Sequence, residues 1–245
     1  MPGKLRDKVA LVTGGSSGIG LAAAELFVKE GARVYITGRR QGPLDAATTR
    51  AGTQLRGVVA DAGDLDDIDR LFATIGDEAG RLDVLFASAG VGNLTEHLAE
   101  VTPESFDQLF GLNVRGALFA AQKAAELMTS GGSIILNGSA AAEKAIPGSS
   151  VYAASKAALK SFARVWSAEL ATRGIRVNVL HPGPTDTPAI SGRPQEVRDF
   201  LVSLTTVGRL AQPFEIATAA LFLASSDSSF VTGTELFVTG GMGQS

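Results

Sequence analysis

The chain has 245 residues, 45% of them hydrophobic and 19% charged, with a formal net charge of −3 at pH 7. This composition is typical of one well-cored globular domain and excludes a disordered or fibrous chain. Without a dense stripe of Lys and Arg, the small negative charge argues against a nucleic-acid partner, because phosphate backbones are bound mainly through clustered positive charge.

Short apolar runs alternate with longer helical patterns along the chain. The predicted strands are residues 9–13, 33–37, 57–60, 83–87, 133–137, 176–180 and 235–238, and the predicted helices are near 21–30, 66–79, 103–128, 152–173 and 213–224. The strands are nearly all apolar, which is typical of strands buried on both faces. Their alternation with helices predicts an α/β fold, a Rossmann-type doubly wound parallel sheet of about seven strands in a single domain over residues 1–245.

A glycine-rich turn follows the first predicted strand. Residues 11–20, LVTGGSSGIG, contain four glycines and two serines. A bare backbone here lets amide groups approach a pyrophosphate, and the following helix adds the positive end of its dipole. A plain tight turn is the alternative, because many turns require glycine. The residues expected to contact a dinucleotide are Gly14, Ser16, Ser17, Gly18, Ile19 and Gly20.

The end of the second predicted strand bears on which dinucleotide binds. A fold that prefers NAD usually has an acid there, about 20 residues beyond the glycine turn, to bind the ribose 2′-hydroxyl. Here the position is Gly38, which leaves space for a 2′-phosphate, and Arg39 follows with a planar guanidinium suited to phosphate oxygens. Arg40 is expected to assist from the loop, with a hydroxyl from Ser16 or Ser17. We predict NADP(H); the alternative is that both arginines form a solvated face.

Four polar residues in the second half form a candidate catalytic set. Tyr152 and Lys156 lie four residues apart in YAASK, Ser139 follows the fifth predicted strand, and Asn113 lies on the predicted helix 103–128. Residues four apart share a helix face, so the Lys156 ammonium can stabilise the phenolate of Tyr152, whose ordinary pKa is about 10. When a hydride reaches a carbonyl carbon, Tyr152 can protonate the oxygen while Ser139 holds it by a hydrogen bond. In isolation, a Tyr and a Lys at this spacing are more often a surface pair.

These motifs have the spacing of a known family. The TGxxxGIG form of the turn, together with Asn113, Ser139 and YAASK, resembles the short-chain dehydrogenase/reductase family. The resemblance continues through PGPTDT at 182–187 and FVTGG near the carboxyl end, and so covers essentially the whole chain. Three positions depart from the family pattern: Ser88 replaces a common Asn, Thr185 replaces a frequent Ile, and Thr239 replaces a more usual Asp.

The resemblance implies further contacts with a dinucleotide. It implies that Lys156 binds the nicotinamide ribose beside Tyr152, and that Asn113 helps to hold a water in a proton relay. The remaining implied contacts are Asp61 at the adenine, Ala89 and Gly90 near the adenine ribose, Pro182, Gly183 and Thr185 beside the nicotinamide, and Thr187 at the carboxamide or a phosphate. For Asp61, a solvated loop position is the alternative.

The leading hypothesis is an NADP(H)-dependent carbonyl reductase or alcohol dehydrogenase that transfers a hydride between nicotinamide and a ketone or secondary alcohol. A 3-oxoacyl-[acyl-carrier-protein] reductase is an alternative on the same scaffold and needs a basic surface for its acidic carrier. Arg115, Lys123 and Lys160 lie on candidate helices but form no compelling cluster. A non-catalytic dinucleotide-sensing protein is the third hypothesis, although such a protein need not retain the four candidate catalytic residues together.

Three segments are expected to shape the substrate pocket. They are residues 140–150, the loop 91–94 and a stretch without a predicted strand, 189–207, which we interpret as a lid. Their side chains are mostly small and apolar, so we expect an apolar or aromatic carbonyl substrate. The resemblance also implies a homotetramer, formed through the helices 103–128 and 152–173 and through the last strand.

The remaining expectations concern compartment and metal. The chain has no cysteine, which excludes disulfides and fits a reducing compartment. The apolar run near the amino end is too short for a signal peptide, and no segment approaches a membrane span, so we expect a cytoplasmic protein without a membrane partner. His97 and His181 are far apart and have no neighbouring carboxylate pattern, so we expect no metal site and assign neither histidine a catalytic role.

Overall fold

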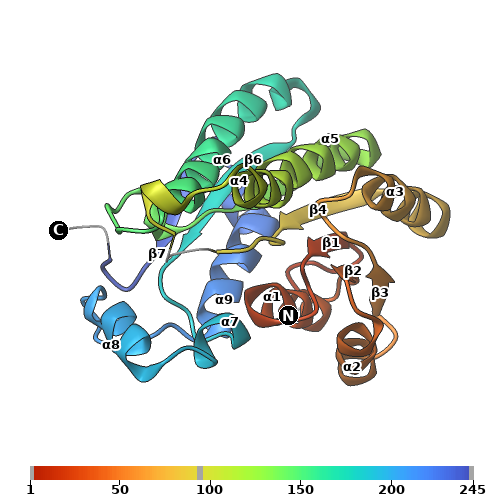
Figure 1. Ribbon diagram of the computed structural model, residues 1–245. Coiled ribbons are helices and arrows are strands. Elements are labelled where there is room, and N and C mark those ends of the chain that lie inside the picture. Colours follow the sequence, from red (N-terminus) through yellow and green to blue (C-terminus); the bar gives the residue numbers. More distant parts are fainter. Residues whose placement is uncertain (1–2, 93–95, 243–245) are drawn as a thin grey trace.

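A parallel sheet of seven strands lies at the centre of the computed structural model, which describes residues 3–92 and 96–242 (Figure 1). The strands are β1 (Val9–Thr13), β2 (Arg33–Gly38), β3 (Leu55–Val59), β4 (Leu82–Ala87), β5 (Met128–Asn137), β6 (Arg176–Pro182) and β7 (Glu235–Val238). Their order is β3-β2-β1-β4-β5-β6-β7, so the chain reverses its direction of winding between β1 and β4. The predicted doubly wound parallel sheet is confirmed.

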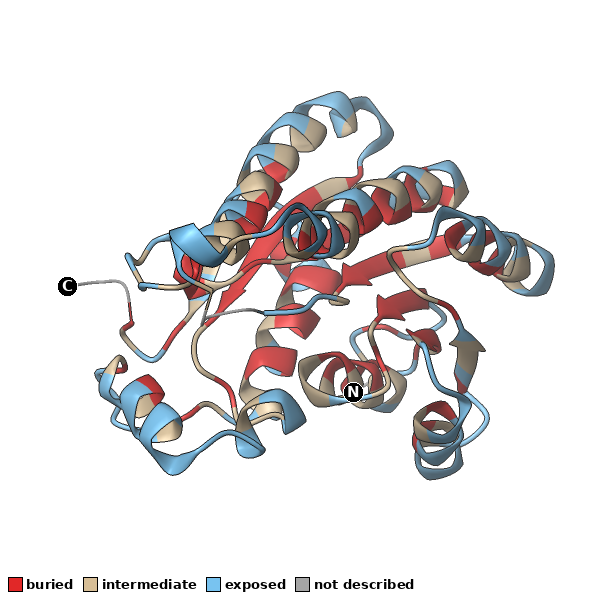
Figure 2. Ribbon diagram, in the orientation of Figure 1, coloured by how far each residue is buried: buried red, intermediate tan, exposed pale blue. Residues whose placement is uncertain are grey.

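Helices cover both faces of this sheet. They are α1 (Gly18–Lys29), α2 (Gln41–Ala51), α3 (Leu65–Ala79), α4 (Pro103–Phe110), α5 (Ala117–Leu127), α6 (Ser150–Glu169), α7 (Pro188–Ser191), α8 (Gln195–Ser203) and α9 (Pro213–Ala224). Figure 2 shows that the central strands are buried and that the covering helices bury only their inner sides. No helix in the two described ranges is both long and apolar enough to cross a membrane.

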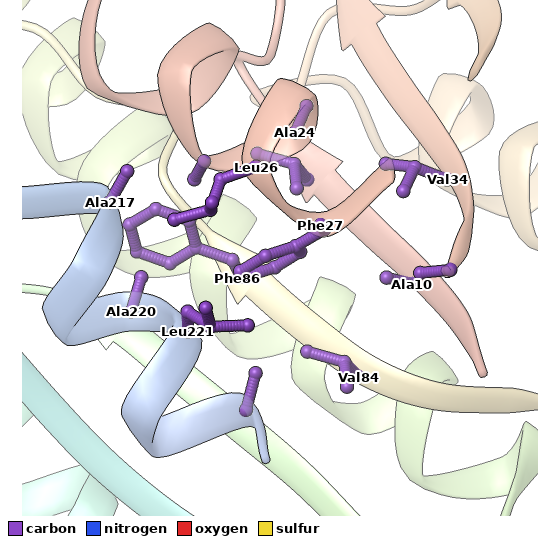
Figure 3. Close-up of a cluster of buried hydrophobic side chains, with 14 of the residues drawn as sticks. Ala10, Ala24, Leu26, Phe27, Val34, Val84, Phe86, Ala217, Ala220 and Leu221 are labelled. Carbon is purple, nitrogen blue, oxygen red and sulfur yellow. The ribbon is translucent and has the colours of Figure 1, made fainter. Parts of the chain in front are cut away.

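The core consists of two apolar clusters, one on each face of the sheet. On one face α1 and α9 pack against the strands, with Phe27, Phe86 and Leu221 in contact at the centre (Figure 3). On the other face α3, α5 and α6 cover residues such as Leu85 and Ile134. Full burial of one such side chain contributes about 1.5–3 kcal/mol, so the two clusters hold the strand ends, and the loops that follow them, in fixed positions.

Two helical segments differ from their prediction. Helix α2 was not predicted, because Gly42 and Pro43 indicate a turn; proline is compatible with a first helical turn, and Leu44 and Ala47 provide a buried face. The predicted helix 103–128 is interrupted by a π-helical turn, Gly111–Gly116, between α4 and α5. π-Helical turns are often found at functional sites, and this one carries Asn113.

The end of the predicted helix 103–128 and the predicted lid also differ in detail. Residue 128 is the first residue of β5 rather than the last of the helix. The stretch 189–207 is not a plain loop, because it contains most of α7 and all of α8. These two helices lie beyond the sheet, below α9 in the view of Figure 1, and α8 is largely exposed.

Candidate active site

A cleft of about 320 Å³ opens at the carboxyl edge of the sheet, where β1 and β4 lie side by side. This is the point at which the strand order reverses, the usual position of a ligand site in open α/β sheets. The sequence-predicted cofactor residues that line it are Gly14, Ser16, Ser17, Gly18, Ile19, Gly20, Arg39, Asp61, Ala89, Gly90 and Thr187. The fold therefore brings together residues from five separate loops in one cleft.

The glycine-rich turn is closely packed against its neighbours. Gly14 has a φ of +65°, and a Cβ atom there would lie 2.8 Å from Ala89 Cα. A Cβ on Gly20 would lie 2.5 Å from the Gly14 carbonyl oxygen, so side chains at these positions would separate α1 from the turn. Because α1 begins at Gly18, its free amide groups and the positive end of its dipole lie at the cleft. This backbone cradle fits a dinucleotide pyrophosphate.

The end of β2 places Arg39, but not Arg40, at the cleft. Arg39 lines the cleft, whereas Arg40 is the exposed residue that precedes α2 and is outside the lining. The Ser16 side chain occupies the space that a side chain at position 38 would need. A Cβ at Gly38 would lie 2.7 Å from Ser16 Oγ. Ser16, Gly38 and Arg39 therefore form one small polar corner of the cleft.

Lys156 is a buried cation below the cleft. It lies on α6, its side chain is 3% exposed, and its Nζ donates a hydrogen bond to the Asn137 carbonyl oxygen at 2.7 Å. Burial lowers the pKa of the Lys156 ammonium to about 8, because a charged group loses hydration inside the protein. Its Nζ lies 5.9 Å from the centre of the Tyr152 ring and close to Gly90.

Tyr152 and Ser139 meet at the end of β5. The two side chains are neighbours, and the Ser139 hydroxyl accepts a hydrogen bond from Ala141 N at 3.2 Å. Burial raises the pKa of the Tyr152 phenol, and the Ser139 contact offsets this only in part. We expected Lys156 to lower this pKa; in this structure burial of the phenol raises it, and Lys156 Nζ donates its hydrogen bond to the Asn137 carbonyl oxygen.

Asn113 uses its amide group to fasten two elements to the π-helical turn. Its Oδ1 accepts a hydrogen bond from Val91 N, and its Nδ2 donates one to Val91 O, both at 3.0 Å. The Nδ2 also donates to Ser155 Oγ at 3.1 Å, on the helix of Tyr152 and Lys156. Asn113 thereby ties the loop after β4 to α6; its implied part in a water relay stays a prediction.

Tyr152 and Lys156 lie outside the lining of this cleft, as Arg40 does, and so do the three residues implied beside the nicotinamide. Pro182 ends β6, Gly183 N donates to Val238 O at 2.9 Å, and Thr185 Oγ1 donates to Gly183 O at 2.9 Å. These contacts stabilise the turn that leads to Thr187. The end of β7 thus supports this turn, which gives the region around Thr239 a structural role.

The expected substrate segments are described in part. Residues 140–150 begin with a short helical turn, Ala140–Ala142, directly after Ser139. Val91 lines the cleft, whereas Asn93 and Leu94 of the loop 91–94 lie outside the described residues.

The three candidate cations for an acidic carrier all have partners. Arg115 Nη2 donates to Gly63 O at 3.0 Å, and Lys123 Nζ lies 2.8 Å from Asp69 Oδ1. Lys160 pairs with two acids, Glu143 and Glu235. Lys123 and Lys160 are therefore paired with acids, whereas the partner of Arg115 is a backbone carbonyl oxygen.

Sequence reasoning missed His181, which ends up beside the catalytic set. It lies in β6, is fully buried, and its Nδ1 is 3.1 Å from Ser139 N. The sequence signals only that His181 follows the apolar residues of a strand. Its contact with Ser139 has no local signal, because the two residues are 42 positions apart along the chain.

Comparison with known proteins agrees with this geometry. Residues 14–243 match a family model described as "Enoyl-(Acyl carrier protein) reductase". The chain is 44% identical to Oxidoreductase asL5 of Sarocladium schorii and 36% identical to the cyclopentanol dehydrogenase of a Comamonas species, in each case over 98% of both chains. It superposes with a TM-score of 0.93 on a short-chain dehydrogenase/reductase from Serratia marcescens, at 33% identity over 98% of this chain and 99% of the other.

Proposed function

Because this chain belongs to the short-chain dehydrogenase/reductase family and is an oxidoreductase with a nicotinamide cofactor, we propose that it is an NADP(H)-dependent reductase of apolar ketones. The reverse reaction is oxidation of the matching secondary alcohols. The observation that carries the proposal is that the side chains of Ser139 and Tyr152 are neighbours, with the buried Lys156 ammonium on the next turn of the same helix as Tyr152.

The Tyr152 phenol is the proton donor of this mechanism. Burial raises its pKa, so the phenol carries its proton at neutral pH, and a carbonyl oxygen that approaches the Ser139–Tyr152 pair finds two hydroxyl donors. The reduced nicotinamide supplies the hydride when the cofactor is bound. As negative charge develops on the oxygen, Tyr152 gives up its proton, and the Lys156 ammonium stabilises the phenolate that remains. Oxidation of an alcohol uses the same groups in reverse, with Tyr152 as the base.

The preference for NADP(H) rests on the corner made by Ser16, Gly38 and Arg39. An acid at position 38 would accept bonds from a ribose 2′-hydroxyl and repel a 2′-phosphate, and glycine removes this repulsion. The Arg39 guanidinium at the cleft wall supplies planar donors for phosphate oxygens. Ser16 Oγ beside Gly38 adds a further donor.

The substrate class rests on the surroundings of Ser139. The residues that follow it, Ala140–Ala142, are small and apolar, and two of them are buried. Such a wall favours a ketone without charged groups. The similarity to a protein named cyclopentanol dehydrogenase supports a cyclic apolar substrate.

A carrier-dependent reductase is the second candidate, favoured by the description of the matching family model. It is the weaker one, because two of the three candidate cations, Lys123 and Lys160, are paired with acids. A dinucleotide sensor without activity is weaker still, since it does not need Tyr152, Lys156 and Ser139 close to one another.

The test is cofactor consumption with a panel of carbonyl compounds, each assayed with NADPH and with NADH. We expect turnover of cyclic and aromatic ketones with NADPH, and none that depends on an acyl-carrier protein. Turnover of carrier-linked 3-oxoacyl substrates alone would favour the second candidate. Tight NADPH binding without turnover of any carbonyl would favour the sensor.

A further inference from the structure

His181 lies between Ser139 and the last strand of the sheet. Its Nδ1 is 3.1 Å from Ser139 N, and its Nε2 is 3.2 Å from Glu235 Oε2 on β7. The ring is fully buried and stacks on Phe237, with centroids 4.6 Å apart and planes 12° apart. A buried imidazole therefore joins the backbone of the proposed catalytic serine to a carboxylate on a different element.

The neighbouring backbone is shaped to admit this ring. A Cβ at Gly138 would lie 2.6 Å from His181 Nδ1, so only glycine at that position allows the imidazole to reach Ser139. His181 Nε2 and Glu235 Oε2 are both buried and lie 3.2 Å apart, without the geometry of a hydrogen bond between them, and Oε2 also lies 3.3 Å from Lys160 Nζ. Glu235 is therefore the acid beside Nε2, and Lys160 shares it.

The position of Glu235 favours one tautomer of the ring. A carboxylate 3.2 Å from Nε2 favours a proton on that nitrogen, and in the neutral ring Nδ1 is then an acceptor. As an acceptor, Nδ1 takes the hydrogen bond that Ser139 N donates. Nδ1 also lies 2.9 Å from the Ser139 carbonyl oxygen, so a protonated Nδ1 would bind that oxygen and release the amide.

The charges around the ring come from three elements. Glu235 faces it from β7, Lys160 from α6, and Glu143 from the segment after Ser139; Lys160 pairs with both acids. Burial is the largest influence and lowers the pKa of His181, which keeps the ring neutral at neutral pH.

We propose that His181 is a positioning residue for Ser139. The neutral, Nε2-protonated ring, oriented by Glu235, accepts the Ser139 amide hydrogen and fixes the serine at the point where its hydroxyl meets Tyr152. β7 thereby acts on the active site without contacting substrate. This inference rests on the proposed function, in which Ser139 holds the carbonyl oxygen.

Two variants separate positioning from packing. His181→Phe keeps a ring that can stack on Phe237 but removes both nitrogens, whereas His181→Asn places an amide oxygen near the position of Nδ1. We expect His181→Phe to lower kcat for ketone reduction about 10-fold, the effect of one lost hydrogen bond of about 1.4 kcal/mol. The KM and Kd for NADPH should stay within about twofold of wild type, and His181→Asn should recover most of kcat. An unchanged kcat in His181→Phe, or no recovery in His181→Asn, overturns the proposal.

A spectroscopic readout decides the contact without any assay of activity. The chain has only two histidines, so ring-nitrogen NMR spectra of wild type and of His97→Asn assign the His181 signals directly. We expect a neutral ring with its proton on Nε2 at pH 7. A proton on Nδ1, or a charged ring, contradicts the proposal even if a variant fails to fold. A wild type that reduces no ketone would reject the proposed function instead, and the spectra would still report the contact.

Discussion

The Lys156 ammonium is the buried charge on which the proposed proton transfer depends. Its pKa is about 8 in the folded protein, against 10.5 as its ordinary value, because burial removes its hydration. Between these two pH values the unfolded chain binds a proton that the folded chain does not. Stability therefore rises with pH in this window, as far as Lys156 is concerned.

Lys156→Met isolates this effect. We expect the free energy of unfolding of the wild type, measured relative to Lys156→Met, to rise by roughly 2 kcal/mol between pH 7 and pH 10. Urea denaturation of both proteins at a series of pH values measures the difference. A difference that stays constant with pH would show that folding does not lower the pKa of Lys156.

The second prediction at the residue level concerns Gly38 and Arg39 and the preference for NADPH over NADH. Gly38→Asp introduces a carboxylate that repels a 2′-phosphate and requires Ser16 to rotate away, and Arg39→Ala removes the attraction. The double variant should prefer NADH, as measured by kcat/KM for both cofactors.

Arg40→Ala is the matched control, because Arg40 is exposed and lies outside the cleft lining. It should leave the cofactor preference of the wild type unchanged. A wild type that favours NADH, or a double variant with an unchanged ratio, would contradict the assignment of Arg39.

At the level of elements, the glycine-rich turn and α1 pack so closely that no side chain fits at Gly20. Gly20→Ala places a Cβ 2.5 Å from the Gly14 carbonyl oxygen and should move α1 away from the turn. We expect a loss of about 1–3 kcal/mol in the free energy of unfolding, with at least 10-fold weaker NADPH binding, measured by denaturation and by fluorescence titration.

Gly42→Ala is the control for this variant, because it is also a helical glycine but has open space around its Cβ position. It should stabilise the protein by a few tenths of a kcal/mol to about 1 kcal/mol and leave NADPH binding unchanged. Equal behaviour of the two variants would show that close packing at Gly20 is not needed.

The sequence predicted β1 and β7 with the bounds that the structure has, because each is a largely apolar run. β5 begins at Met128, before the predicted strand 133–137, because the polar and glycine residues 129–132 give no strand signal. The π-helical turn Gly111–Gly116 has no such local signal. It depends on a tertiary contact, since a Cβ at Gly116 would lie 2.0 Å from Ala62 O.

The distinction between local sequence pattern and tertiary contact also applies to the candidate site. Motif spacing predicted the glycine turn and the four catalytic candidates, because each of these residues lies in a short motif that can be recognised in the sequence. It did not predict His181, whose partners Ser139 and Glu235 are brought to it by β5 and β7 pairing on either side of β6.

For the whole molecule, we propose a homotetramer in the cytoplasm. Phe106, on α4, is 42% exposed and stacks on Phe110, and Val165, on α6, is 47% exposed. At the β7 edge of the sheet, Phe237 is 40% exposed. Two apolar surfaces on different sides of the chain suit two kinds of two-fold interface.

Light scattering tests the tetramer. We expect the mass of four copies of the 25.2 kDa chain, and a smaller assembly for Val165→Glu, because a charge would then be buried at the interface. Val59→Glu is the control: Val59 is equally exposed but lies on β3, at the opposite edge from β7. A monomer mass for the wild type would reject the proposal.

The central claim is that Tyr152 donates the proton in NADPH-dependent reduction of a ketone. The direct measurement is single-turnover oxidation of bound NADPH by the preferred ketone, followed in wild type and in Tyr152→Phe. The phenyl ring keeps the packing and removes the donor, so the rate should fall at least about 100-fold while the Kd for NADPH stays unchanged. A near-normal rate in a folded Tyr152→Phe variant would contradict the account.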